Sequence, residues 1–174
     1  MNLKNFTLGD AFNQKINDAQ LPETLECLIF GACFNQPLDN INLPEQLQQL
    51  VFGEEFNQTL HNIKLPAKLQ HLAFGDDFNQ TMNDVTLPTH LETLIFGYDF
   101  NQKLNQVNLP SKLKNLTFGN QFNQNLQEVI LPAHLQHLTF GSNFNYLVQK
   151  NLPDSLKHLT LGASCNHNLK NVDI

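Results

Sequence analysis

What the sequence lacks most plainly is positive charge. It contains no arginine, and its 174 residues include 10 lysines against 16 acidic residues, for a net charge of −6. A protein that binds nucleic acid needs a basic face, and arginine is its main reader of phosphates and guanine. We therefore expect no nucleic-acid partner.

Long apolar runs are missing as well. No stretch approaches the ~20 apolar residues that a membrane-spanning helix needs. The first residues, 1–7, also lack the apolar core of a secretion signal. The sequence therefore predicts no association with a membrane.

Cysteine is scarce, and its placement is irregular. Cys27, Cys33 and Cys165 are an odd number and occupy no recurring position, so we expect no disulfide framework. Two formal glycosylation sites, at Asn57 and Asn79, fall on a recurring asparagine that we expect to be buried. Both observations favour a reducing compartment, and we predict a cytoplasmic, intracellular protein.

Catalytic motifs are absent too. The sequence has no phosphate-cradling glycine loop, no Gly-x-Ser-x-Gly, no His-Glu-x-x-His and no Cys-x-x-Cys. His137 and His158 share a register and should face outward about 5 Å apart on neighbouring strands. A third metal ligand is missing, because Asn115 comes next in that row. We therefore predict no enzyme activity, no metal site and no cofactor.

What the sequence does contain is a 22-residue repeat along its whole length. Leu-Pro pairs begin at Leu21, Leu43, Leu65, Leu87, Leu109, Leu131 and Leu152. Glycines follow at Gly31, Gly53, Gly75, Gly97, Gly119, Gly141 and Gly162. A fixed period of this length is typical of stacked structural units and not of a domain built round a cleft. Because the period never lapses, we expect one domain, residues 1–174.

The unit at residues 65–86 predicts one short strand. The stretch His71-Leu72-Ala73-Phe74 alternates in polarity, so Leu72 and Phe74 should point inward and the other two outward. The residues equivalent to Ala73 are mostly β-branched, which is strand chemistry: Ile29, Val51, Ile95, Thr117, Thr139 and Thr160. Gly75 should then end the strand with a turn.

The rest of the unit does not favour a helix. Between Phe78 and Pro88 the chain is short and rich in Asn, Asp and Gln, and proline follows the leucine that opens each unit. We expect extended segments and single 3₁₀-like turns instead. Each unit is thus predicted to be one coil, with about eight coils stacked through parallel strands.

Two residue types recur with a structural purpose. Thirteen of the 14 phenylalanines occupy two registers, and Phe6 is the exception, so we expect two stacked columns in a continuous core. Asparagine follows the second phenylalanine of each unit, at Asn13, Asn35, Asn57, Asn79, Asn101, Asn123 and Asn145, and recurs at Asn166. We expect these carboxamides to bond to backbone groups of their own turn and to stack as a ladder.

The repeating string resembles the FNIP repeat, also called IP22, a relative of the leucine-rich repeat. The residues that carry the resemblance are Leu87-Pro88, Leu91, Leu94, Phe96-Gly97 and Phe100-Asn101-Gln102. The resemblance implies a leucine-rich-repeat-like solenoid that contacts other proteins and brings no catalytic residues. The family occurs in social amoebae and in large DNA viruses that infect them, and some members carry an F-box.

The best candidate site is the outward strand face of the second to fifth coils, together with its bordering turns. An apolar stripe there is flanked by acidic turn residues. The candidate partner-binding residues are Ile29, Val51, Glu54, Glu55, His71, Ala73, Asp76, Asp77, Ile95, Tyr98 and Asp99. The alternative is that strand propensity and solvated turns alone explain this pattern.

Charge distribution indicates which partner would fit. Residues 1–87 hold 4 lysines and 11 acidic residues, a net of −7, whereas residues 88–174 hold 6 and 5, a net of +1. A partner approaching the first half would therefore be basic.

The function predicted from all of these observations is a non-catalytic protein-interaction module, such as the recognition segment of an F-box-type adaptor. An alternative is a structural protein that self-associates end to end, because the repeat pattern stops in mid-register at both ends and should leave core residues exposed there.

Overall fold

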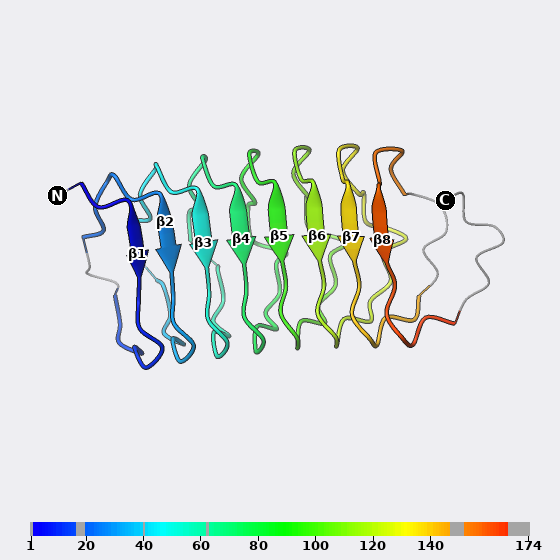
Figure 1. The fold of residues 1–174 in the computed structure, drawn as a ribbon, viewed down its shortest axis with the longest axis horizontal. Helices are drawn as coiled ribbons and strands as arrows, with labels where there is room; N and C mark the ends of the chain where they lie inside the picture. Colours follow the sequence, from blue (N-terminus) through cyan, green and yellow to red (C-terminus); the bar gives the residue numbers. More distant parts are fainter. Residues whose placement is uncertain (1, 17–19, 40, 62, 147–151, 167–174) are drawn as a thin grey trace.

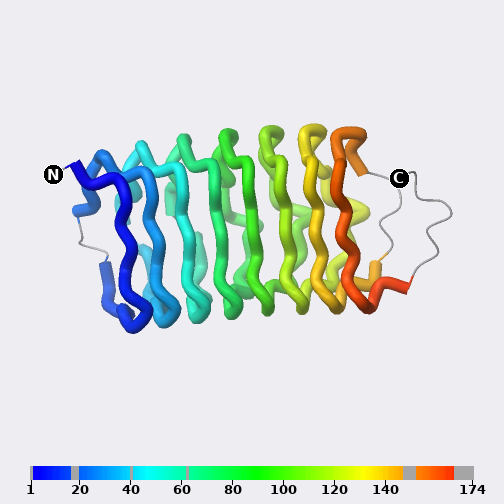
Figure 2. Tube along the Cα trace, viewed as in Figure 1, coloured from blue at the N-terminus to red at the C-terminus, as the bar shows by residue number. Residues whose placement is uncertain are grey.

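The computed structural model describes residues 2–16, 20–39, 41–61, 63–146 and 152–166, and it shows a solenoid of stacked coils (Figures 1 and 2). Each coil carries one three-residue strand, and we number the coils by their strands. The strands are β1 (Asn5–Thr7), β2 (Cys27–Ile29), β3 (Gln49–Val51), β4 (His71–Ala73), β5 (Thr93–Ile95), β6 (Asn115–Thr117), β7 (His137–Thr139) and β8 (His158–Thr160). The described residues contain no helix, so none that could cross a membrane. The predicted solenoid with little or no helix is confirmed.

The strands form a single parallel sheet in sequence order, β1 to β8. Equivalent residues pair directly, as Leu72 does with Leu50 on one side and Leu94 on the other. Figure 1 shows the strands side by side along the long axis of the molecule. The pairing of His137 with His158 keeps this register although coil 7 is one residue shorter. The missing position falls between residues 146 and 152, outside the described residues.

The interior is a continuous apolar column. The central leucine of each strand from β2 to β7 is buried, and Phe78 and Phe100 are 0% exposed. Phenylalanine rings stack both within and between coils: the Phe74 and Phe78 centroids are 3.9 Å apart, and those of Phe78 and Phe100 are 6.0 Å apart. The two predicted phenylalanine columns are confirmed. Stacked aromatic pairs add to the stabilisation from buried apolar area.

Outside the strands, the described parts of the coils contain hydrogen-bonded turns and no helix. In coil 4 the N–H of Leu69 donates to Pro66, that of Phe78 to Gly75, and that of Val85 to Met82, at 3.0–3.4 Å. Equivalent bonds recur in the neighbouring coils. The predicted single turns are therefore present, and each satisfies a backbone donor where the chain changes direction.

The predicted turn after Gly75 is present, since the N–H of Phe78 donates to the Gly75 carbonyl, but the glycine is needed for another reason. None of the glycines adopts a left-handed conformation, so their role is not to permit a turn. Instead, a Cβ added to Gly97 would lie 2.0 Å from the carbonyl oxygen of Gly75 and 2.3 Å from its carbonyl carbon. Adjacent coils approach each other too closely here for any side chain.

The asparagine ladder exists, but its bonds run between coils. The Oδ1 atom of Asn79 accepts the backbone N–H of Asn101 at 3.0 Å and Nε2 of Gln102 at 2.8 Å. The prediction that each carboxamide serves its own turn was wrong, because the acceptor points along the solenoid axis. The expected burial was also wrong: Asn57 and Asn79 are half-buried. The glutamine that follows each ladder asparagine, whose role was not predicted, is the second donor.

Candidate functional site

The outward strand face presents two rows of side chains. The pleat places the first and third residues of each strand outward, while the central residue is buried. In coils 2 to 5 the third-position row is apolar and lies nearest the turns. Ile29, Val51 and Ala73 are half-buried, and Ile95 reaches 36% exposure. A continuous apolar stripe therefore crosses four coils.

The turns at the arrowhead end of the strands form a ridge beside this stripe (Figure 1). Backbone bonds continue the ladder into these turns: the N–H of Asp77 donates to Glu54 at 2.9 Å, and that of Asp99 donates to Asp76 at 2.8 Å. The turn residues thus stand in columns at the coil spacing. Glu54, Asp76 and Tyr98 occupy one column, and the other is formed by Glu55, Asp77 and Asp99.

The ridge in coils 3 to 5 carries uncompensated negative charge. None of its five carboxylates forms an ion pair within the described residues. Three described lysines form ion pairs, but with carboxylates outside the ridge: Lys4 with Glu26, Lys64 with Glu45, and Lys114 with Glu92. A hydrogen bond to Glu55, with burial and the charges of nearby carboxylates, raises the pKa of the Cys33 thiol. Stacked like charges are mutually destabilising, so a basic partner would relieve this ridge.

Coils 6 and 7 differ at the same positions. Their turns carry neutral side chains that bond to one another: Asn143 donates to Gln121 at 2.8 Å, and the Ser142 hydroxyl donates to Asn120 at 3.0 Å. The third-position row there changes to threonine. The apolar stripe and the acidic ridge therefore end together after coil 5.

All eleven predicted site residues lie on this one strand-and-turn face. His71 lies in the first-position row, and the others form the stripe and the ridge. That they bind a partner stays a prediction. Two exposed apolar residues elsewhere were missed, Ile130 at 87% and Tyr146 at 41% exposure. Comparison of the repeats could have identified both residues. Ile130 occupies a position that is polar in the other repeats, and Tyr146 replaces a glutamine.

The two outward histidines are the nearest approach to a metal site in the described part of the chain. The rings of His137 and His158 are stacked with centroids 4.5 Å apart, close to the predicted spacing. No group of three or more His, Cys, Asp or Glu residues gathers among the described residues. All three cysteines are free thiols.

This parallel, one-strand-per-coil architecture with a buried leucine in each strand defines a solenoid of the leucine-rich-repeat type. The FNIP repeat matches residues 1–33, 34–77, 78–121 and 122–164. The chain belongs to the FNIP repeat family. Repeat solenoids of this kind are scaffolds typical of protein-interaction modules and typically lack enzyme activity.

Similarity to a solved structure agrees with this assignment. A protein described as CroV588, "a novel circular LRR protein", is 41% identical in sequence, with a TM-score of 0.75. The match covers 97% of this chain and 28% of that protein, so this chain spans about a quarter of the length of its structural relative. No curated protein matches the sequence.

Proposed function

We propose that the stripe and ridge of coils 2 to 5 bind a protein partner through a basic, partly apolar segment. The observation that carries the proposal is the coincidence of two features that the fold does not require. An apolar row in coils 2 to 5 runs beside five carboxylates in coils 3 to 5 that form no ion pair within the described residues, and both features end at the same boundary. An apolar patch with a polar rim is the usual signature of an interface.

The geometry favours an occupant that lies across the coils. Coils repeat at the strand spacing of about 4.8 Å, so the stripe offers a regular series of shallow apolar contacts. Lysine or arginine side chains on one edge of such a segment would reach the carboxylates of Glu54, Asp76 and Asp99. Charge complementarity of this kind mainly sets specificity and association rate.

The test uses the double variant Val51→Glu/Ile95→Glu. Both side chains point outward, so the free energy of unfolding should change by no more than about 1 kcal/mol. We expect the variant to lose capture of partners from a lysate of the source cell, and to lose binding to a panel of Lys-rich peptides containing alternate apolar residues. Unchanged capture and unchanged peptide binding would refute the location of the site.

A matched control separates this face from the rest of the sheet. Thr117→Glu/Thr139→Glu places the same charges at the same strand position in coils 6 and 7. This control should bind as the wild type does. A second arm, Glu54→Gln/Asp76→Asn, should weaken binding most at low salt, because screening removes ionic attraction.

A more specific form of the proposal concerns the cellular role. We propose a non-catalytic, cytoplasmic recognition segment of an adaptor, such as an F-box-type protein. What supports this form is the family resemblance and the free thiols of Cys27, Cys33 and Cys165. Co-purification of the full-length protein with a ubiquitin-ligase subunit would test it, and its absence at native expression would count against it.

A second candidate function is end-to-end self-association through the first coil. Phe12 is half-buried, whereas Phe34 and Phe56 in the same column are 0% exposed. Among the described residues nothing lies within 4 Å of a Cβ built on Gly9, unlike every later glycine. Phe12 and Gly9 are thus the outermost members of their columns among the described residues, and a second copy could stack on them.

Sedimentation across a range of concentrations distinguishes the two functions. Self-association predicts species that grow with concentration and that disappear in Phe12→Lys. The strand-face variant Val51→Glu/Ile95→Glu should leave such assembly intact. A strict monomer at all concentrations would remove this second candidate and leave the first untouched.

A further inference from the structure

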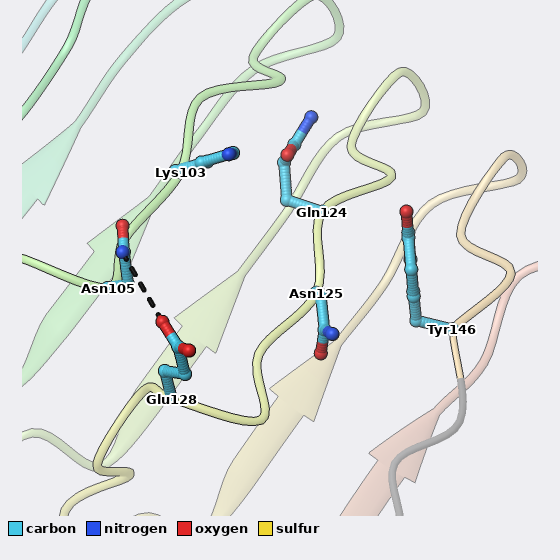
Figure 3. Close-up of a pocket in the computed structure, with 6 residues that line it drawn as sticks. All are labelled: Lys103, Asn105, Gln124, Asn125, Glu128 and Tyr146. Carbon is cyan, nitrogen blue, oxygen red and sulfur yellow. Dashed lines mark hydrogen bonds between the residues drawn. The ribbon is translucent and has the colours of Figure 1, made fainter.

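A small hollow lies on the return side of coils 5 to 7, away from the stripe and ridge (Figure 3). It has a volume of about 280 Å³. Its walls are Lys103, Asn105, Gln124, Asn125, Glu128 and Tyr146. Three consecutive coils thus contribute polar side chains to one depression, and the only aromatic ring in it is that of Tyr146.

The hollow forms where the glutamine ladder stops. In coils 2 to 6 the residue after the ladder asparagine is glutamine, and its Nε2 donates to the preceding asparagine; Gln124 bonds to Asn101 at 2.9 Å in this way. Coil 7 has Tyr146 at that position, which cannot supply the bond and stands 41% exposed. The chain thus lacks a stabilising ladder bond in this coil and exposes a ring instead.

Some polar groups around the ring are already engaged: Asn125 bonds to Gln127 through both its Nδ2 and its Oδ1, and Nε2 of Gln124 donates to Asn101. The two charged side chains remain largely free. Lys103 forms no ion pair or hydrogen bond within the described residues, and Glu128 makes only a long contact, 3.5 Å, with the amide of Asn105. Figure 3 shows Lys103 directed toward Gln124 and the ring of Tyr146 edge-on, so that one ring face borders the hollow. Donors, acceptors and an aromatic face therefore surround one space.

We propose that this hollow binds one ring of a neutral saccharide. The apolar C–H face of a sugar would pack on Tyr146, because an aromatic face is electronegative and attracts polarised C–H groups. The carboxamide oxygens of Asn105 and Gln124 have no partner within the described residues and can accept from the hydroxyls of a sugar. Glu128 accepts from hydroxyl groups, and Lys103 donates to them.

Other ligand classes fit less well. An anion would be repelled by Glu128, and a cation by Lys103. A wholly apolar ligand would cover the charged groups of Lys103 and Glu128 without replacing their bonds to water, which is unfavourable. The volume is at the lower limit for small-molecule sites, so it suits a single ring and not a long chain of sugars.

The natural test variant is Tyr146→Gln, since it restores the residue that the earlier coils carry. It should fold normally, with a urea midpoint equal to or above that of the wild type, because Gln can donate to Asn123 as Gln124 does to Asn101. Lys103→Thr is a second matched variant, because coils 3 and 4 have threonine at that position.

Binding is measured by titration with the methyl glycosides of glucose, galactose, mannose and N-acetylglucosamine, followed by amide chemical shifts. The chain has two tyrosines and no tryptophan, so in a Tyr98→Phe background its fluorescence reports on Tyr146 alone. We expect at least one glycoside to bind with a millimolar Kd, as befits a small open site. In Tyr146→Gln its affinity should fall by at least about tenfold.

A second arm distinguishes free sugars from protein-linked glycans. A glycoprotein is tested before and after enzymatic removal of its glycans; binding that disappears with the glycans supports the proposal and identifies the source. Three results would overturn it. They are no response to any glycoside or glycoprotein, equal binding by Tyr146→Gln, or tighter binding of a zwitterionic dipeptide than of any sugar.

Discussion

The inward and outward sides of the same strands differ in how far the residue type varies from coil to coil. The inward central position is leucine in every strand from β2 to β8, and its neighbours in the interior are stacked phenylalanines. The outward third position changes from isoleucine, valine and alanine in coils 2 to 5 to threonine in coils 6 to 8. Both sides have the same backbone and the same register.

This difference shows which residues the fold needs and which it leaves free. Inward residues must match the coils above and below, since each ring and each glycine contacts its own counterpart. Outward residues meet solvent and need only strand propensity. A change of chemistry on the outward side therefore carries information about function, whereas repetition on the inward side carries information about structure.

The largest effect should come from the phenylalanine column. Phe78→Ala removes a ring that is 0% exposed and stacks on Phe74, Phe56 and Phe100. We expect a loss of about 4 kcal/mol in the free energy of unfolding, measured by urea denaturation. Ile95→Ala, on the outward side, should lose no more than about 0.5 kcal/mol. Similar losses in both variants would erase the contrast between the two sides.

The glycine column offers a contrast within one register. Gly97→Ala forces a Cβ to within 2.0 Å of the Gly75 carbonyl oxygen, so the coils must separate, and we expect a loss of about 3 kcal/mol. Gly9→Ala meets nothing within 4 Å among the described residues and should be neutral within about 0.5 kcal/mol. Thermal unfolding of the two variants checks this, and a tolerant Gly97 would contradict the close approach.

The asparagine ladder should show a smaller, graded effect. Asn79 Oδ1 accepts two bonds from coil 5, whereas Asn123 Oδ1 accepts only the N–H of Asn145 in the described structure. Replacement by alanine should therefore lose about 2 kcal/mol at Asn79 and about 1 kcal/mol at Asn123. Equal losses would mean that the glutamine donor contributes nothing, and Gln102→Ala tests that donor alone.

The smallest effect belongs to a surface ion pair. A hydrogen bond from Lys114 at 2.8 Å lowers the pKa of Glu92 below its usual value. Because the folded pKa is the lower one, this pair stabilises the protein above the unfolded pKa of glutamate and loses that contribution as the pH falls through the folded value. The pair is partly exposed, so we expect less than about 0.5 kcal/mol. Glu92→Gln should remove this part of the pH dependence below neutral pH.

Most of the fold could be predicted from the sequence because period and alternation determine a stacked coil almost by themselves. The strand positions, the phenylalanine columns and the asparagine ladder all follow from which residues recur. Two causes could not be inferred. Gly75 is needed because its Cα lies against the backbone of the preceding coil, and Asn79 bonds to the next coil. Both facts depend on the distance between coils and not on local chemistry.

The site was less predictable than the fold. The stripe and ridge could be located because repeats place outward residues in rows, yet the pairing of lysines elsewhere, which leaves the ridge unneutralised, required side-chain positions. Tyr146 was visible as a departure from the repeat, but its neighbours in the hollow come from three coils. Their convergence depends on how the return segments pack.

A single exchange tests most directly whether the outward rows carry recognition while the inward columns carry the fold. Replacing Ile29, Val51, Ala73 and Ile95 with threonine gives coils 2 to 5 the row that coils 6 to 8 possess. Binding of the best Lys-rich peptide and the urea midpoint are then measured on the same sample. We predict that the peptide binds at least about tenfold more weakly while the urea midpoint stays unchanged. Unchanged binding, or a midpoint that falls together with it, would contradict this division.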